Sequence, residues 1–386
     1  MKVVLISNYF THHQSSICEE LHRLTNGGFI FVETEIMEKE RVDLGWNITH
    51  QPKYIIKAYE CNTQQIVEKL INEADVVIIG SAPDKFIKKR LKEKKLIFRY
   101  SERIFKKKFR WYKWPIWCIK FYLAHIRHEN LYLLTASAYA SADYAKMFSF
   151  IKKSYKWGYF PEVKKHENID GLIEEKNKNS IVWVARLIDW KHPEIAIKLA
   201  ERLKKDGYDF ELKMIGNGTL LANVSKEVEE CGLTDCVNIL GAMSPEEVRS
   251  HMEKSEIHIF TSDRNEGWGA VLNESMNSAC VPVANHAIGS VPFLLKDGEN
   301  GFIYKDGDFE DFYNKVKYLL DNPEKRIEMG KKAYQTMINE WNAENAAKKF
   351  IELCETYLKT GKMGTKFEKG VCSKAKILKD DWYNGK

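Results

Sequence analysis

The 386-residue sequence lacks several features that would assign its compartment or chemistry directly. Its eight cysteines include no CxxC pair and no metal-ligand spacing, so we interpret them as free thiols, mostly small core residues, in a reducing compartment. No apolar run approaches the roughly 18 residues of a membrane-spanning helix, and the run after Met1-Lys2 is too short for a signal peptide. We therefore expect a cytoplasmic protein without a metal centre.

Two common phosphate-binding motifs are also missing. The chain has no GxxxxGK[ST] loop and no GxGxxG turn, which argues against a kinase, another P-loop protein or a dehydrogenase. What is present is ordinary for a folded protein: 44% hydrophobic and 30% charged residues, over a length that fits about two domains.

Charge is unevenly distributed along the chain. Residues 1–160 contain 27 Lys and Arg against 16 Asp and Glu, a net +11, whereas the remainder contains 33 against 38, a net −5. The densest basic stretch, 85–113, has fourteen basic and two acidic residues and runs into a cluster of aromatic residues. We predict a membrane-surface segment over 85–125, because Lys and Arg beside Trp and Tyr suit an anionic bilayer. A solvated basic face above an aromatic core and, less favoured, a nucleic-acid site are the alternatives.

Apolar runs and helical periodicity alternate through both halves, as they do in parallel α/β sheets. The strands predicted in the first half are 3–8, 29–32, 75–80, 96–100 and 131–134. Those predicted in the second half are 180–185, 210–215, 237–240, 257–260 and 281–284. We predict two doubly wound, Rossmann-like α/β domains that face a cleft.

A Gly and a Pro interrupt the pattern at 155–161 (YKWGYFP), and a polar stretch follows. We place the domain boundary there, with an N-terminal domain at 1–162 and a C-terminal domain at 163–341. The polar and basic residues 361–386 predict a loosely ordered tail or a short final segment.

Polar residues follow the predicted strands of the second domain almost at once. Ligands of open parallel sheets bind outside the carboxyl ends of the strands, so these residues are expected to line one crevice. They are Arg186, Gly216, Thr261, Ser262, Asn285 and His286.

Two carboxylates lie at the same edge, Glu266 and Glu274, with seven residues between them. Glu266 precedes a helix predicted at 270–279, whose apolar stripe can pack on a sheet with Glu274 roughly opposite. Gly267 and Gly269 let the chain turn sharply near a bound group. Taken alone, the pair also fits a capping acid and a solvated helix face.

Three further loops of the second domain suit phosphate. Arg186 and Lys191 share the loop after its first strand, where two cations could neutralise a diphosphate, although plain surface cations are the alternative. Gly216-Asn217-Gly218 would let a flat base or a phosphate approach the backbone. Gly289-Ser290 opens a short helix whose N–H groups suit phosphate.

Together these residues resemble the nucleotide-sugar-binding half of the retaining, two-Rossmann-domain (GT-B) glycosyltransferases of family four, also called group 1. The resemblance is strong over residues 180–305 and weak over the first 160, and it rests on the order and spacing of short motifs. These are Arg186-Leu187 with Lys191, Gly216-Asn217-Gly218, Leu240-Gly241, Ser262, Glu266 to Glu274 (EGWGAVLNE), Pro282-Val283-Ala284, Gly289 and Gly298 to Gly301 (GENG).

The resemblance implies a role for each matched residue. Arg186, Lys191 and Glu266 would be the catalytic group, the two cations stabilising charge on the leaving diphosphate and Glu266 contacting the donor sugar. Glu274 would bind the ribose hydroxyls, and backbone amides near Gly289-Ser290 would touch the phosphates. The other donor-binding positions implied are Gly216, Asn217, Gly218, Ser262, Gly267 and Gly269. A last helix at 342–360 would cross back to the N-terminal domain, and no obligatory metal or other cofactor is implied.

The first domain departs from the family pattern. Where the family often has a Gly-rich loop after the first strand, this chain has residues 9–14, and where it often has a His after a later strand, this chain has residues 100–103. His12, His13 and Glu102 are therefore the acceptor-side candidates, although a loop histidine is more often a surface group.

We expect a retaining glycosyltransferase that moves a sugar from a nucleoside diphosphate sugar to a glycan or lipid-linked acceptor. It would be cytoplasmic and held peripherally on the inner face of the plasma membrane. A nucleotide-sugar epimerase or hydrolase on the same fold is one alternative, and a non-catalytic nucleic-acid-binding protein is another. The intact set Arg186, Lys191, Glu266 and Glu274 disfavours the binding protein.

Overall fold

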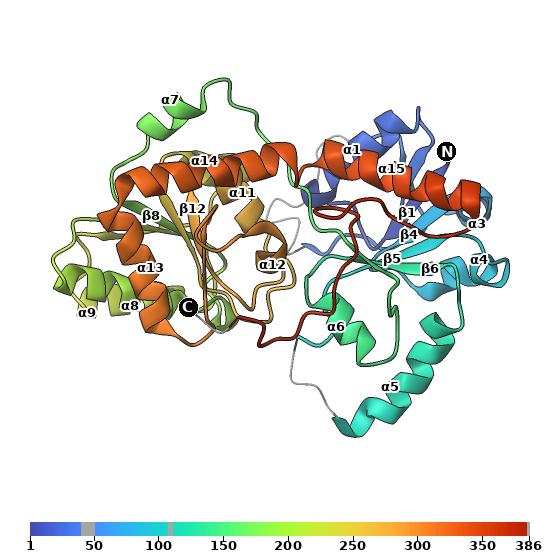
Figure 1. Cartoon of the computed structure of the whole chain (residues 1–386), viewed down its shortest axis with the longest axis horizontal. Helices are drawn as coiled ribbons and strands as arrows, with labels where there is room; N and C mark the ends of the chain where they lie inside the picture. The colour runs from blue at the N-terminus through green and yellow to red at the C-terminus, as the bar shows by residue number, and fades with distance from the viewer. Residues whose placement is uncertain (40–50, 107–110, 384–386) are drawn as a thin grey trace. The chain divides into compact units, whose positions relative to one another are not determined.

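The computed structural model describes residues 1–39, 51–106 and 111–383. Their contacts divide the chain into two units, each an α/β domain (Figure 1). Unit 1 contains Met1–Glu162 and Trp341–Lys379, and unit 2 contains Val163–Glu340 and Asp380–Lys386.

Unit 1 is built on a seven-stranded sheet in the order β3-β2-β1-β4-β5-β6-β7, and every neighbouring pair is parallel. The strands are β1 (Val3–Ser7), β2 (Phe29–Glu33), β3 (Ile55–Lys57), β4 (Val76–Ile79), β5 (Ile97–Ser101), β6 (Leu131–Thr135) and β7 (Ser154–Lys156). Every residue of β1 and β4 is buried, which explains why these strands are nearly continuous apolar runs.

Helices flank this sheet, and the last helix of the chain is one of them. They are α1 (His12–Leu24), α3 (Gln64–Glu73), α4 (Lys88–Lys92), α5 (Trp114–Phe121), α6 (Ala140–Ala145) and α15 (Ala343–Thr360). Helix α15 packs against α1, although the two lie at opposite ends of the sequence. The C-terminal helix therefore belongs to the core of the first unit.

Unit 2 has a six-stranded sheet in the order β10-β9-β8-β11-β12-β13, again entirely parallel. The strands are β8 (Ser180–Val184), β9 (Glu211–Ile215), β10 (Val237–Gly241), β11 (Ile257–Phe260), β12 (Val281–Asn285) and β13 (Phe302–Tyr304). Its largest apolar cluster joins the sheet to α8, α9 and α13 and includes Trp183, Leu199 and Phe312.

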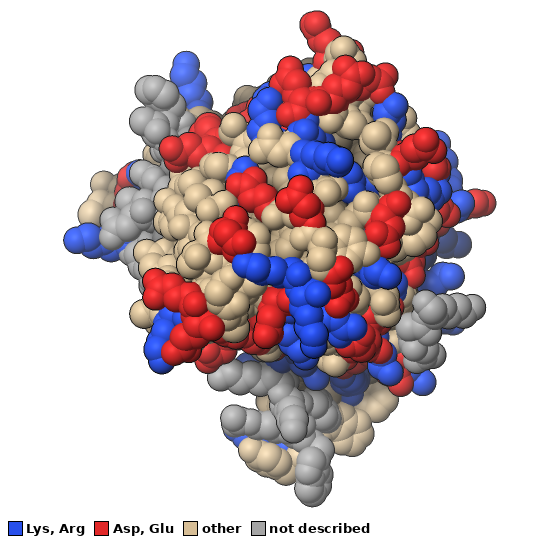
Figure 2. Space-filling view, turned by 90° about the vertical axis from the view of Figure 1, so that its left-hand side faces the viewer, with Lys and Arg blue, Asp and Glu red and all other residues tan. Residues whose placement is uncertain are grey.

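Most helices of unit 2, but not α9 (Leu221–Glu230) or α11 (Val271–Asn277), begin at a Pro or a capping side chain. The described helices of this unit are α7 (Ile169–Glu174), α8 (Pro193–Lys205), α9 (Leu221–Glu230), α10 (Pro245–Glu253), α11 (Val271–Asn277), α12 (Val291–Leu294), α13 (Phe309–Asp321) and α14 (Pro323–Asn339). Ser244 and Glu247 form a capping box at the start of α10. On the face that carries α8, α9 and α13, basic and acidic side chains are interspersed (Figure 2). One such pair is Lys204 with Asp235.

The ten predicted strands and the prediction of two Rossmann-like domains are confirmed, with strand ends that differ by at most one residue. The sequence missed β3, β7 and β13. Each of these is three residues long, too short to show either a buried apolar run or a period of two.

Within the described residues after α15, 361–383, the chain is fixed on unit 1 around residues 371–374 and does not form a loose tail. Val371 and Cys372 are fully buried in unit 1, and Lys374 forms an antiparallel bridge with Tyr155 beside β7. Lys156 N donates to Ser373 O at 2.8 Å. The few apolar positions of this segment therefore suffice to fix it, because they fill a site at the edge of the sheet.

Candidate functional site

The carboxyl ends of β8 and β11 are neighbours in the sheet of unit 2. From β8 the chain winds outward to β9 and β10, and at β11 it returns to the other side of β8, so the winding direction reverses between these two strands. Ligands of open α/β sheets bind at such a reversal. We call the loops 185–192 and 261–270, which follow these strands, the β8/β11 edge.

An ion pair joins the two loops of this edge. Lys191 Nζ donates to Glu266 Oε2, and both side chains are only 11% exposed. The backbone of Lys191 is held as well, because its carbonyl accepts from Thr261 Oγ1 at 2.6 Å, and that hydroxyl accepts from Trp183 Nε1 at 2.8 Å. The ammonium lies 4.4 Å from the centre of the Trp190 ring. The edge thus holds a fixed, largely desolvated pair of opposite charges.

Arg186 adds a second cation to the first loop. Its side chain is exposed, and among the described residues no ion pair or hydrogen bond to its guanidinium is found. Its backbone is placed by the Ile188 N–H, which donates to Arg186 O at 2.9 Å. The charge is therefore available to an anion that enters the edge.

Glu274 lies in the first turn of α11 and is half-buried. Burial raises the pKa of its carboxyl group, and the positive charge of Arg249 opposes that rise. Arg249 donates to Glu274 O and Asn277 Oδ1, at 3.2 and 2.8 Å, and not to the carboxylate. Within the described part of the chain this carboxylate accepts no hydrogen bond, so a ligand with hydroxyl groups would supply the missing donors.

Two buried serines at the same end of the sheet have unused hydroxyl groups. Ser262 follows β11 and Ser290 precedes α12, and both are almost completely buried. Neither Oγ atom has a hydrogen-bond partner among the described residues. An unsatisfied buried hydroxyl costs about 1 to 3 kcal/mol, so these two groups point to a bound ligand or water.

The Gly216-Asn217-Gly218 segment packs on the neighbouring loop. A Cβ at Gly216 would lie 1.8 Å from Ala185 O, and one at Gly218 would lie 2.3 Å from Leu187 O. Asn217 O accepts from Leu187 N at 3.0 Å. The close approach that the sequence suggested for a base or phosphate is made here by the protein backbone, and these residues position the loop that carries Arg186.

The amides of Gly289 and Ser290, predicted to touch phosphate, are already used within the protein. Gly289 N donates to Glu266 O at 3.3 Å, and Ser290 N donates to Trp268 O at 3.2 Å. Helix α12 behind them has only four residues. These two amides therefore satisfy carbonyls of the loop 261–270, and contact between phosphate and the amides near Gly289-Ser290 stays a prediction.

Gly267 and Gly269 flank Trp268, whose side chain is buried. Gly269 has a φ of +85°, and a Cβ there would lie 2.5 Å from the Phe260 ring and 3.2 Å from Glu266 Cγ. Gly269 is thus required for Glu266 to fold back over Phe260 toward Lys191.

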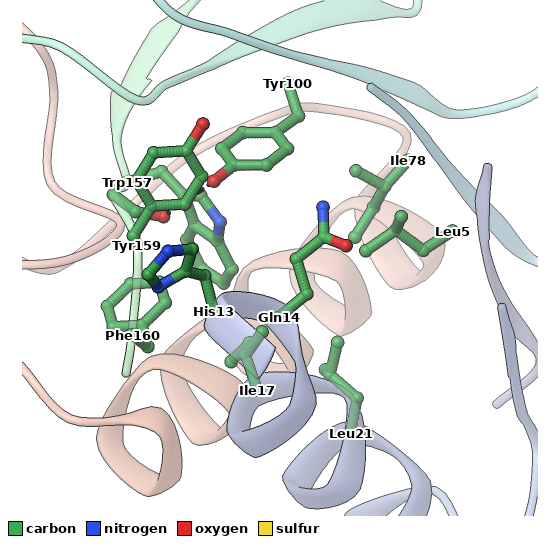
Figure 3. Close-up of a pocket in the computed structure, with 11 residues that line it drawn as sticks. Leu5, His13, Gln14, Ile17, Leu21, Ile78, Tyr100, Trp157, Tyr159 and Phe160 are labelled. Carbon is green, nitrogen blue, oxygen red and sulfur yellow. Dashed lines mark hydrogen bonds between the residues drawn. The ribbon is translucent and has the colours of Figure 1, made fainter. Parts of the chain in front are cut away.

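Unit 1 contains a small pocket (Figure 3). Its lining is mostly aromatic and aliphatic: Leu5, His13, Gln14, Ile17, Leu21, Ile78, Tyr100, Trp157, Gly158, Tyr159 and Phe160. Figure 3 shows the amide of Gln14 between Tyr100 and the aliphatic side chains of Leu5 and Ile78. Gln14 Oε1 is buried without a hydrogen-bond partner among the described residues.

Of the three acceptor-side candidates, His13 lines this pocket, and Glu102 is hydrogen-bonded to the lining residue Tyr159. Burial and the neighbouring His12 lower the pKa of His13 to about 3, so His13 is neutral near pH 7. Its ring lies 6.3 Å from that of Tyr159, whose Oη donates to Glu102 Oε1 at 2.8 Å. The other carboxylate oxygen accepts from Lys106 Nζ at 2.7 Å. His12 stacks beside His13 but does not line the pocket.

The sequence missed most of this pocket. Trp157, Tyr159 and Phe160 come from the YKWGYFP segment, which was interpreted only as a domain boundary. The density of aromatic residues in that segment was the available signal.

Residues 1–39, 51–106 and 111–383 contain neither a metal-binding cluster nor a membrane-spanning helix. No group of three or more His, Cys, Asp or Glu side chains lies close enough together to hold a metal ion. No helix of these residues is long and apolar enough to cross a membrane. The eight cysteines are free thiols, and four of them are buried, so the prediction that most lie in the core holds for only half of them.

Comparison with known sequences concerns mainly unit 2. Residues 164–336 match the family described as Glycosyl transferases group 1. The alpha-D-kanosaminyltransferase of Streptomyces kanamyceticus is 30% identical over 153 residues, which cover 40% of this chain and 39% of that protein. The amylovoran biosynthesis glycosyltransferase AmsK of Erwinia amylovora is 29% identical over 133 residues, or 33% and 32% of the two chains. The chain thus spans about a third to two fifths of these curated relatives.

Comparison with solved structures covers nearly the whole chain. HepE of Anabaena in complex with UDP is 12% identical with a TM-score of 0.69, covering 92% of this chain and 100% of that one. The apo form of the lipopolysaccharide outer core galactosyltransferase WaaB is 16% identical with a TM-score of 0.67, covering 91% and 98%. These likenesses show that the chain has the GT-B fold.

Proposed function

We propose that this chain, whose residues 164–336 match the Glycosyl transferases group 1 family, is a glycosyltransferase that uses a nucleoside diphosphate sugar. The acceptor hydroxyl oxygen forms a bond to the anomeric carbon, and the bond from that carbon to the diphosphate oxygen breaks. The electron pair of that bond leaves with the nucleoside diphosphate, and the hydroxyl proton is released. In this proposal the anomeric configuration is retained.

The observation that carries the proposal is the charge arrangement at the β8/β11 edge. Arg186 is exposed without a partner among the described residues, and Lys191 is fixed beside Glu266. Two cations aimed at a diphosphate would stabilise the negative charge that develops as it departs. Glu266 would then accept hydrogen bonds from the sugar, while Glu274 would accept them from the ribose. Arg186, Lys191 and Glu266 are the proposed catalytic residues, and no obligatory metal is proposed.

Other residues of the edge would bind or position the donor. The unsatisfied hydroxyls of Ser262 and Ser290 are suited to donate to phosphate or sugar oxygens. Gly216, Gly218 and Gly269 act through the loops that they hold in place. UDP is the first nucleotide to test, because HepE was crystallised with it.

The acceptor would be a glycan or a lipid-linked glycan intermediate. Amylovoran biosynthesis and the lipopolysaccharide outer core, named for AmsK and WaaB, support this class. In unit 1 we assign the acceptor side to the pocket with His13 and to Glu102, which Tyr159 joins to it. We also propose a peripheral location on the inner face of the plasma membrane.

The test is nucleotide release from a panel of nucleoside diphosphate sugars, with and without glycan acceptors. Wild-type protein should release one nucleotide selectively, and Lys191→Ala should lower the rate about 10²-fold to 10³-fold because it removes a cation that acts on the leaving group. Lys205→Ala, an exposed residue in the last turn of α8, is the matched control and should leave the rate unchanged. Equal rates for wild type and Lys191→Ala would contradict the proposal.

A further inference from the structure

Helix α5 of unit 1 is an apolar helix with no buried residue. It continues into a π-helical turn, Tyr122–Ile126, and in Figure 1 it lies at the outer edge of the unit, apart from the strands of the sheet. Ile116 and Ile119 are 70% and 64% exposed, and Tyr122 and Leu123 are also exposed. A helix of this composition normally has a covered side, but nothing in the described part of the chain covers these four side chains.

A second segment extends the same surface. Phe148 and Ile151, in the loop after α6, are exposed. Trp114 connects the two segments, because its Nε1 donates to Lys146 O at 2.8 Å and its ring lies 5.9 Å from that of Phe148. We call this surface the apolar patch: Ile116, Ile119, Tyr122, Leu123, Phe148 and Ile151.

The two segments that form the apolar patch also carry exposed cations. No Asp or Glu occurs in the sequence from Arg103 to His128. Lys120 and Arg127 are exposed on the helical segment, and Lys152 is exposed on the loop segment. Lys146 on the loop segment is also exposed, but it pairs with Asp143 at 3.5 Å. Of the predicted segment 85–125, residues 107–110 lie outside the described residues. The described part therefore combines uncovered aliphatic and aromatic side chains with cations.

The upstream part of the basic run is a less suitable surface, because several of its cations have partners inside the protein. Arg90 is fully buried and donates to the carbonyls of Ile71, Ala74 and Leu96 at 2.6 to 2.9 Å. Arg103 is buried beside Asp143 at 3.5 Å. Within the predicted membrane-surface segment 85–125, Arg90 and Arg103 are therefore not available to a bilayer.

The charge beside the apolar patch and the length of its helix indicate which partner binds it. Two copies of this chain meeting through the patch would place cations against cations. Nucleic acid would satisfy the cations but not the exposed aliphatic side chains. An anionic bilayer satisfies both, and α5 with its π-helical turn is far shorter than the roughly 20 residues needed to span one.

We propose that Trp114–Ile126 lies in the plane of an anionic bilayer surface, with Phe148 and Ile151 inserted beside it. This inference deepens the peripheral location proposed above and names the residues that make the contact. It rests on unit 1 alone and is measured without donor or acceptor, so its failure would leave the transfer reaction untouched.

The experiment is flotation of the full-length protein with vesicles of phosphatidylcholine, with and without phosphatidylglycerol. Wild-type protein should float with the anionic vesicles, and Ile116→Glu/Ile119→Glu should reduce binding at least about tenfold, because carboxylates are repelled from the apolar and anionic layer. Ile66→Glu is the matched control: Ile66 is 54% exposed on α3 of the same unit and should float as wild type does. Thermal unfolding of each variant verifies folding.

Other outcomes would overturn the proposal. One is wild-type protein that stays unbound to anionic vesicles but dimerises in sedimentation velocity, with the dimer lost in Ile116→Glu/Ile119→Glu. Another is an equal loss of flotation in Ile66→Glu. Added salt should weaken flotation without abolishing it, since the apolar contact is unscreened. Complete loss in salt, with competition by an oligonucleotide, would instead assign the surface to nucleic acid.

Discussion

The two units share a parallel sheet flanked by helices, but they differ in what lies at the edges. At the β8/β11 edge of unit 2, charged and hydroxyl side chains from separate loops converge, with Lys191 and Glu266 paired. Unit 1 instead has a pocket lined mostly by aromatic and aliphatic side chains. Separately, none of the residues of its helix α5 is buried. Binding of a diphosphate demands a few charges at set positions, whereas aromatic and aliphatic surfaces tolerate many residue types. The first kind of site is therefore visible as a sequence motif, and the second becomes visible only in the fold.

The largest loss of stability is expected on substitution of Gly216, because the loop after β9 contacts the loop after β8 there. Gly216→Ala should lower the free energy of unfolding by more than about 3 kcal/mol, because its Cβ would overlap the Ala185 carbonyl. Gly207→Ala is the control, since Gly207 also has positive φ but has open space around it, and it should cost about 1 kcal/mol. Urea unfolding measures both. Equal losses of unfolding free energy in the two variants would mean that the contact between the loops does not stabilise unit 2.

The next largest effect is expected on acidification, which should lower the stability of unit 1 more than that of unit 2. Burial is the largest cause that lowers the pKa of His13, His125 and His258 to about 3, and the first two lie in unit 1. Their unfolded forms bind a proton near pH 6.5, so between pH 6.5 and 3 the unfolded state holds more protons and stability falls as pH falls. Each histidine contributes about 1.4 kcal/mol per pH unit at most.

Calorimetry at pH 7, 6 and 5 checks this expectation. The transition of unit 1 should shift down about twice as far as that of unit 2, and His125→Phe should reduce the shift of unit 1. A stability that rises on acidification below pH 6.5 would show that these histidines are not held neutral.

A smaller effect is expected where the chain end docks on unit 2. Tyr383 Oη donates to Asp297 Oδ2 at 2.8 Å and accepts from Lys315 Nζ at 2.6 Å. Tyr383→Phe should therefore destabilise unit 2 by about 1 kcal/mol. Tyr318→Phe, which removes an exposed hydroxyl from α13 of the same unit, should change stability by less than about 0.5 kcal/mol. If thermal unfolding gives similar values for both variants, the hydrogen bonds of Tyr383 do not stabilise unit 2.

Much of the fold was predictable from sequence, because buried parallel strands are apolar runs and each such run marks a strand. The same logic located Arg186 and Ser262, since the residues that follow parallel strands share one edge of the sheet. The hydrogen bonds of Gly289 and Ser290 to Glu266 and Trp268 were not predictable, because they join residues about twenty positions apart through loop geometry.

Unit 1 was less predictable for a physical reason. Arg90 lies in a run of lysines and has the sequence pattern of a surface charge. Its guanidinium is nevertheless buried and donates hydrogen bonds to backbone carbonyls of Ile71 and Leu96. The pocket likewise combines the start of α1 with the segment 157–160, and nothing in either segment alone indicates the other. Contacts between distant segments determine both features.

The central claim, a nucleotide site at the β8/β11 edge, is tested most directly by thermal stabilisation with a panel of nucleoside diphosphates. Wild-type protein should be stabilised selectively by one base, by about 2.7 kcal/mol at 100 times the dissociation constant. Glu274→Ala should reduce that shift, whereas Glu246→Ala, an exposed residue of α10, should not. If no nucleoside diphosphate shifts the transition, or if Glu274→Ala is stabilised as much as wild type, the assignment of the edge is contradicted.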